Sequence, residues 1–158
     1  LGPWDKAPDG GGREVPLDRF FLGYKKLDLA CGEIIRAIRI PLLPPGARFH
    51  FEKVANRATL DIAAVNSAIR LTVDDAGSVT DLRLAAGGVA PVPLLLPGLD
   101  RFVGGPLDAA LATAVATAAH DAVTPIDDVR GTASYKRLLL RQLVQAHFAA
   151  IAGPEVMP

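Results

Sequence analysis

Three charged residues, Lys53, Arg57 and Asp61, stand four positions apart in the chain. In a strand, alternation would put Lys53 on the same face as Phe49 and Phe51, and we expect this apolar face to point into the core. Asp61 shares the parity of the apolar positions that follow it. A buried charge without a partner is costly. The spacing therefore predicts either a structural ion pair or charges that face a polar ligand at the end of a sheet, and the pattern leaves both open.

Few other residues suggest chemistry. The single cysteine, Cys31, cannot form an internal disulfide or a cysteine-built metal site, and we expect it to be a bystander thiol. The histidines His50, His120 and His147 lack metal-ligand spacing and are expected to be packed or at the surface. The sequence has no phosphate-binding or dinucleotide-binding glycine motif and no G-x-S-x-G. The Gly87–Gly88 pair could allow a ligand or another chain to approach closely.

Composition limits the class of protein. Half of the 158 residues are hydrophobic, 22% are charged and the net charge is zero, which favours a folded core and argues against binding to nucleic acid or to an anionic membrane. No apolar run approaches the roughly 20 residues of a membrane span. A single cysteine fits a reducing compartment, so we expect a cytoplasmic protein. Residues 1–13 are mostly turn formers and predict a loose N-terminal segment.

Three regular strands are predicted, over 49–56, 63–73 and 79–87, with a hairpin turn at 74–77 between the last two. Upstream, the alternating β-branched run 34–40 predicts a further strand that ends at a proline.

The C-terminal third is predicted to be helical, over 107–122 and 135–151. Leu139 and Leu143 lie on one apolar stripe of the second helix and are expected in the core. Strands followed by helices predict an α+β fold, in which helices pack on one face of a three- to four-stranded, mainly antiparallel sheet.

Four segments, 17–41, 53–65, 85–91 and 124–144, together resemble one family. Their motifs are F-F-L-G-Y-K-K followed by G-E-I-I, then K-x-x-x-R-x-x-x-D-I-A-x-V, then A-A-G-G-V-A-P, and finally D-x-R-G-T-A-x-Y-K. The family is the FAD-binding subunit of molybdenum hydroxylases, and the chain resembles in particular the small subunit of bacterial xanthine dehydrogenase. The motifs occur in family order over nearly the whole chain.

The resemblance also implies a domain organisation. Residues 1–41 would be the C-terminal remnant of the α+β FAD-binding domain, and residues 42–158 the C-terminal α+β domain of the flavoprotein. The family's glycine-rich diphosphate-binding stretches and its iron–sulfur modules have no counterpart here, so we expect the C-terminal part of a longer polypeptide that is inactive alone.

In the complete enzyme the resemblance implies hydroxylation of a purine at a molybdopterin centre in the large subunit. Electrons would then pass through 2Fe-2S clusters to FAD and on to NAD. Ile35 and Lys53 would contact the flavin, and Arg57 and Asp61 would form an ion pair that shapes the loop beside it. Two alternatives stay open: a non-catalytic assembly domain that packs on a flavin domain and on partner subunits, and the flavin subunit of a relative such as carbon monoxide dehydrogenase.

Overall fold

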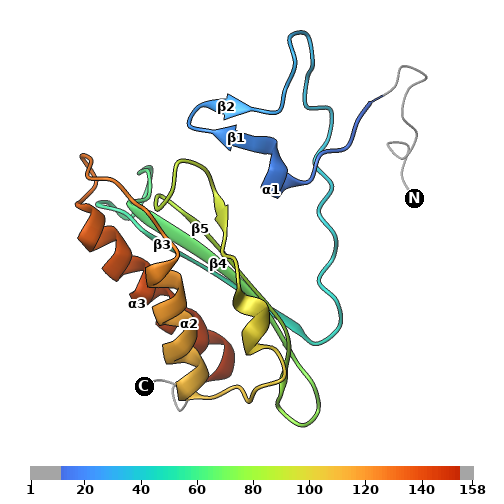
Figure 1. The fold of residues 1–158 in the computed structure, drawn as a ribbon, viewed down its shortest axis with the longest axis vertical. Coiled ribbons are helices and arrows are strands. Elements are labelled where there is room, and N and C mark those ends of the chain that lie inside the picture. The colour runs from blue at the N-terminus through green and yellow to red at the C-terminus, as the bar shows by residue number, and fades with distance from the viewer. Residues whose placement is uncertain (1–11, 154–158) are drawn as a thin grey trace.

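The computed structural model describes residues 12–153, so the predicted loose segment 1–13 lies almost wholly outside the described part. The main body has two layers, an antiparallel sheet and a pair of helices that cover one of its faces (Figure 1). The strands, in their spatial order, are β3 (Ala47–Val54), β4 (Val65–Val73), β5 (Val79–Gly87) and β6 (Leu94–Leu95), and a 3-10 turn, η1 (Leu99–Phe102), leads to the helices α2 (Ala109–Asp121) and α3 (Ala133–Ala152). The predicted α+β fold is confirmed.

The core lies between the sheet and the helices. Strands β4 and β5 pair with Ile69 opposite Leu84 and Leu71 opposite Leu82, and all four side chains are buried. On α3, Leu143 is 6% exposed, as its stripe predicts, and Leu139 is partly buried against the same cluster. The apolar periodicity of this helix therefore identifies its buried face correctly.

The N-terminal segment forms a separate small unit. It contains α1 (Leu17–Phe20) and a two-stranded sheet of β1 (Phe21–Gly23) and β2 (Lys26–Leu27), which lie on the side of the main sheet away from the helices (Figure 1). An irregular stretch follows, up to the start of β3.

The strand predicted over 34–40 does not form, so this prediction is wrong. Alternation had suggested it, but a strand also needs a neighbour to receive its backbone hydrogen bonds. In the described residues this segment pairs with no strand, and Ile34, Ile38 and Ile40 are largely exposed.

The predicted orientation of β3 is also wrong. Its helix-facing side carries His50, which contacts His147 of α3, whereas Phe49, Phe51 and Lys53 lie on the opposite side of the sheet. Phe49 and Phe51 are 55% and 52% exposed. Alternation separates the two faces of a strand, but it does not determine which face the helices cover.

Candidate functional site

Lys53, Arg57 and Asp61 come together in the loop that links β3 to β4. The Lys53 ammonium donates to the Asp61 carbonyl oxygen at 2.8 Å. The Arg57 backbone N–H donates to the Asp61 carboxylate at 3.0 Å, and the Arg57 guanidinium lies 3.9 Å from the same carboxylate and donates to the Leu60 carbonyl. The predicted ion pair between Arg57 and Asp61 is therefore present, and Lys53 binds the main chain of Asp61 instead of its carboxylate.

These contacts stabilise a bent, solvent-exposed loop. Leu60 has a positive φ of 51°, an unusual conformation for a branched side chain, and it is 95% exposed. Among the contacts described for this loop, Asp61 supplies the only carboxylate, and its side chain is 20% exposed. The Asp61 carboxylate therefore balances the charge of Arg57, while Lys53 binds only a carbonyl and keeps its positive charge and two further N–H donors at an exposed position.

The backbone at Gly88 packs against Ala64, at the end of this loop. Gly88 has φ of 81°, and a Cβ placed there would overlap the carbonyl oxygen of Ala64. A Cβ at the neighbouring Gly87 would also have little room, because it would lie 2.9 Å from the side-chain oxygen of Asn66. The close approach that this glycine pair could allow is made by the chain's own Ala64 and Asn66, at the start of β4.

Lys53 projects from the uncovered face of the sheet, which we call the open face. Strand register places Phe51 opposite Ala68 and Phe49 opposite Arg70 on this face. Further along, Ala68 is paired with Ala85 and Ala85 with Leu95, so an apolar strip of Phe51, Ala68, Ala85 and Leu95 crosses all four strands of the open face. Lys53 lies on one side of this strip, and Arg70 and Arg83, which both contact Asp81, lie on the other. An apolar strip with Lys53 beside it suits an extended aromatic ligand or an apolar partner.

Ile35 lies outside this sheet. It belongs to the irregular stretch of the N-terminal segment and is 56% exposed. The structure thus gathers three of the four predicted site residues and leaves Ile35 on a separate segment.

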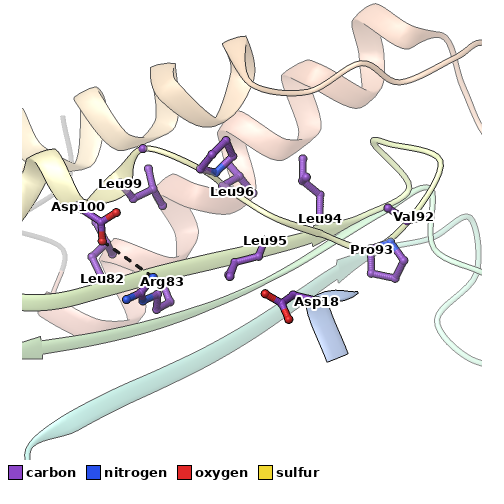
Figure 2. Close-up of a pocket in the computed structure, with 12 residues that line it drawn as sticks. Asp18, Leu82, Arg83, Val92, Pro93, Leu94, Leu95, Leu96, Leu99 and Asp100 are labelled. Carbon is purple, nitrogen blue, oxygen red and sulfur yellow. Dashed lines mark ion pairs between the residues drawn. The ribbon is translucent and has the colours of Figure 1, made fainter. Parts of the chain in front are cut away.

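A hollow of about 360 Å³ lies at the other edge of the sheet, between β5, β6 and η1 (Figure 2). Figure 2 shows Leu94 and Leu96 pointing toward the helices, whereas Leu95 points the other way, toward Asp18 of α1. Arg83 and Asp100 face each other at 3.9 Å on its wall. None of the predicted site residues lines this hollow.

Sequence reasoning missed one polar cluster, which lies beneath α3. His147 bonds to His50 (Nδ1 to Nδ1, 2.8 Å) and to Ser67 (Nε2 to Oγ, 2.7 Å), and Glu52 lies 3.5 Å from the other side of His50. Burial and the nearby His50 lower the pKa of His147 from 6.5 to about 4. The prediction that the histidines are packed or exposed is confirmed, since His147 is fully buried and His120 lies at the surface.

The same cluster resembles a nucleophile–base pair but cannot act as one here. Ser67 is 1% exposed, and no hollow described above reaches it. A nucleophile must touch its substrate. In the sequence, the cluster shows only as two polar residues, His50 and Glu52, on the same face of one strand. His147 lies 97 residues from His50, so no local motif joins them.

The D-x-R-G-T-A-x-Y-K motif builds the start of α3. Lys136 is 2% exposed and its ammonium donates to the Asp128 carboxylate at 2.8 Å and to the Ile126 carbonyl at 2.9 Å. This contact and the Arg130 backbone N–H lower the pKa of Asp128. The Thr132 hydroxyl caps the helix by accepting from the Tyr135 N–H. These contacts give the motif a structural role within this chain.

Comparison with known proteins gives the chain its relatives. Residues 50–151 match the family model of the CO dehydrogenase flavoprotein C-terminal domain. The chain is 33% identical over 136 residues to the carbon monoxide dehydrogenase medium chain of Hydrogenophaga pseudoflava, covering 85% of this chain and 47% of that one. It is 36% identical over 100 residues to xanthine dehydrogenase 1 of Arabidopsis thaliana, covering 61% of this chain and 7% of the relative.

Solved structures agree with this fold. Carbon monoxide dehydrogenase from Hydrogenophaga pseudoflava, in a form that lacks the Mo-pyranopterin moiety, aligns with a TM-score of 0.78 at 31% identity, over 84% of this chain and 46% of that chain. Quinoline 2-oxidoreductase from Pseudomonas putida 86 aligns with a TM-score of 0.78 at 26% identity, over 91% and 50%. The chain thus spans half or less of the length of these relatives. In residues 12–153 no helix has the length and apolar character needed to cross a membrane.

Proposed function

Because the chain belongs to the CO dehydrogenase flavoprotein C-terminal domain family, we propose that it is the C-terminal part of the FAD-containing subunit of a molybdenum hydroxylase, and that this enzyme is a xanthine dehydrogenase linked to NAD. The F-F-L-G-Y-K-K and R-G-T-A-S-Y-K segments support the xanthine enzyme. Carbon monoxide dehydrogenase is the second candidate, supported by the longer match to its medium chain.

The observation that carries the flavin role is the position of Lys53 beside Phe51 on the open face. A flat, electron-rich ring needs an apolar surface for its face and hydrogen-bond donors for its edge. The residues present fit the ring part of FAD, because the Lys53 ammonium keeps two N–H donors next to an uncovered phenylalanine. When bound, FAD would supply the electron-accepting chemistry.

In this proposal Lys53 binds the edge of the ring and favours negative charge there. The Asp61 carbonyl orients the ammonium, and Arg57 fixes Asp61 through its backbone N–H. Ile35 would add a contact from the N-terminal segment. Residues 1–41 would belong to the FAD-binding half, whose remainder would cover the open face. The iron–sulfur modules and the molybdopterin-binding large subunit would be further partners in a cytoplasmic enzyme.

The test replaces Lys53 in the complete enzyme. Lys53→Met should lower the flavin midpoint potential, since it removes a positive charge that stabilises the reduced ring. It should therefore slow reduction of the flavin, and with it the passage of electrons to NAD, while purine binding stays unchanged. Spectroelectrochemical titration measures the potential. Arg141→Met is the matched control, because Arg141 is an exposed cation of α3 and that helix covers the other face of the sheet.

The competing function is that of an assembly domain, in which Lys53 only fixes its loop through the Asp61 carbonyl. In that case Lys53→Met would lower the melting temperature and leave the potential of a fully occupied flavin unshifted. That combination would reject the flavin role.

A further inference from the structure

A row of four polar side chains joins α3 to the edge strand β3. Ser67 Oγ lies 2.7 Å from His147 Nε2, His147 Nδ1 lies 2.8 Å from His50 Nδ1, and His50 Nε2 lies 3.5 Å from a Glu52 carboxylate oxygen. The row begins in the core, where Ser67 and His147 are buried, and ends at Glu52, whose side chain is 41% exposed. It is thus a connected path from the core to the sheet edge.

No other charged group of the described neighbouring elements is seen to contact the row. The buried residues of α2 are all apolar: Leu111, Ala112, Val115, Ala116 and Ala119. On β3, Arg48 donates to the Ile151 carbonyl, farther along α3. The neighbouring β4 contributes Ser67 and the apolar Ile69, which is paired with His50. The titratable groups along the row from His147 are therefore His50, in direct contact, and Glu52 beyond it.

With both imidazoles neutral, the two bonds of His147 allow two opposite arrangements of protons, and the nearby Glu52 carboxylate favours one of them. The Glu52 carboxylate only accepts, so it favours a proton on His50 Nε2 and leaves His50 Nδ1 as an acceptor. His147 must then donate from Nδ1, and its Nε2 accepts from the Ser67 hydroxyl. Every donor in the row points from the core toward Glu52.

One added proton can be accommodated if the direction of the hydrogen bonds along the row reverses. A proton on His50 Nδ1 would donate to His147 Nδ1, provided that His147 moves its own proton to Nε2 and donates to Ser67. A second added proton cannot be accommodated. Both Nδ1 atoms would then carry hydrogen across 2.8 Å, and the buried positive charge of His147 would face a second positive charge on the part-buried His50.

We propose that Ser67, His147, His50 and Glu52 form a proton-operated latch that fastens α3 to β3 with zero or one added proton and releases it with two. The low pKa of His147, about 4, agrees with a costly second protonation. The latch needs no flavin and is independent of the proposed function. Release would free the strand that bears Lys53 on its other face.

The test is nitrogen-15 NMR of the histidine rings in this chain, followed from about pH 8 to about pH 4. We expect His147 to carry its proton on Nδ1 at the upper end and to move it to Nε2 as His50 becomes charged. Amide exchange in α3 should accelerate in step with the second protonation. An Nε2–H tautomer of His147 at about pH 8, or two histidines titrating independently at ordinary pKa values, would overturn the latch.

Two variants separate the latch from simple packing. His50→Phe keeps a ring in place but removes its Nδ1 acceptor, so His147 should hold its proton on Nε2 throughout the pH range in which it is neutral. Glu52→Ala removes the acceptor that orders the row at a partly exposed position, and it should shift His147 in the same direction without unfolding the chain. His120→Gln, at an exposed histidine paired with Asp121, should change neither tautomer. Unchanged tautomers in both test variants would reject the proposal.

Discussion

Among single residues, His147 should make folding stability depend on pH. Its pKa falls from 6.5 to about 4 on folding, so the unfolded chain binds more protons than the folded chain between these values. Its contribution is fully present above pH 6.5 and is lost as pH falls toward 4. A shift of this size corresponds to about 3 kcal/mol at ~1.4 kcal/mol per pH unit. Urea unfolding at about pH 7 and about pH 5 should show about 2 kcal/mol of this difference, because the whole of it is reached only below the folded-state pKa of about 4.

Two variants assign that pH dependence to one residue. His147→Gln keeps an amide that can bond to Ser67 but does not titrate, so the loss of unfolding free energy on acidification should shrink. His120→Gln removes an exposed histidine and should leave the loss as it is. Equal pH dependence in the wild type and His147→Gln would contradict the assignment.

The candidate site was only partly predictable at this scale. The spacing of Lys53, Arg57 and Asp61 does predict that they meet, because four-residue steps around a turn bring polar groups close together. The sequence could not predict that Lys53 binds a carbonyl, since main-chain acceptors leave no trace in residue identities. It could not pair His50 with His147 either, because their contact depends on how α3 crosses the sheet.

For the structural elements, Gly88 and Gly77 form a matched pair. Both have φ near 80°, but a Cβ at Gly88 would overlap the Ala64 carbonyl oxygen, whereas one at Gly77 would meet nothing. Left-handed backbone costs an L-residue about 1–2 kcal/mol. Gly77→Ala should therefore lose about that amount, and Gly88→Ala clearly more. Urea midpoints of the two variants measure the difference, and equal losses would mean that the β3–β4 loop yields freely around Gly88.

The strands also show which part of the fold follows from the sequence. The segments 63–73 and 79–87 were predicted well because alternation there coincides with burial on one side, as in β4 and β5. The segment 34–40 has the same alternation without a neighbouring strand. On β3 the more apolar face is the open face, since the inward side satisfies His50 through His147. Alternation of apolar and polar residues indicates a strand, but the strand forms only beside a neighbouring strand, and packing determines which face points inward.

In the whole molecule, the main body and the N-terminal segment differ in how they bury apolar surface. The body has a continuous core between sheet and helices. The N-terminal segment is held by polar contacts within itself, where Arg13 binds Asp28 and Glu33. Many of its apolar side chains, including Ile34 and Ile40, are exposed. This contrast supports the proposal that residues 1–41 pack on the remainder of an FAD-binding half.

Deleting residues 1–43 should therefore leave the main body folded with an unchanged urea midpoint. The segment reaches the body at the hollow through Asp18, and the first backbone bond of the body, from Ala47 N–H to the Pro44 carbonyl, is retained. Binding of a hydrophobic dye should fall, because exposed apolar side chains leave with the segment and large apolar patches are what such dyes report. Far-UV circular dichroism in urea and dye fluorescence measure both effects. A lower midpoint would show that the segment stabilises the body directly, and Asp18→Ala in the undeleted chain would then test whether the contact at the hollow is responsible.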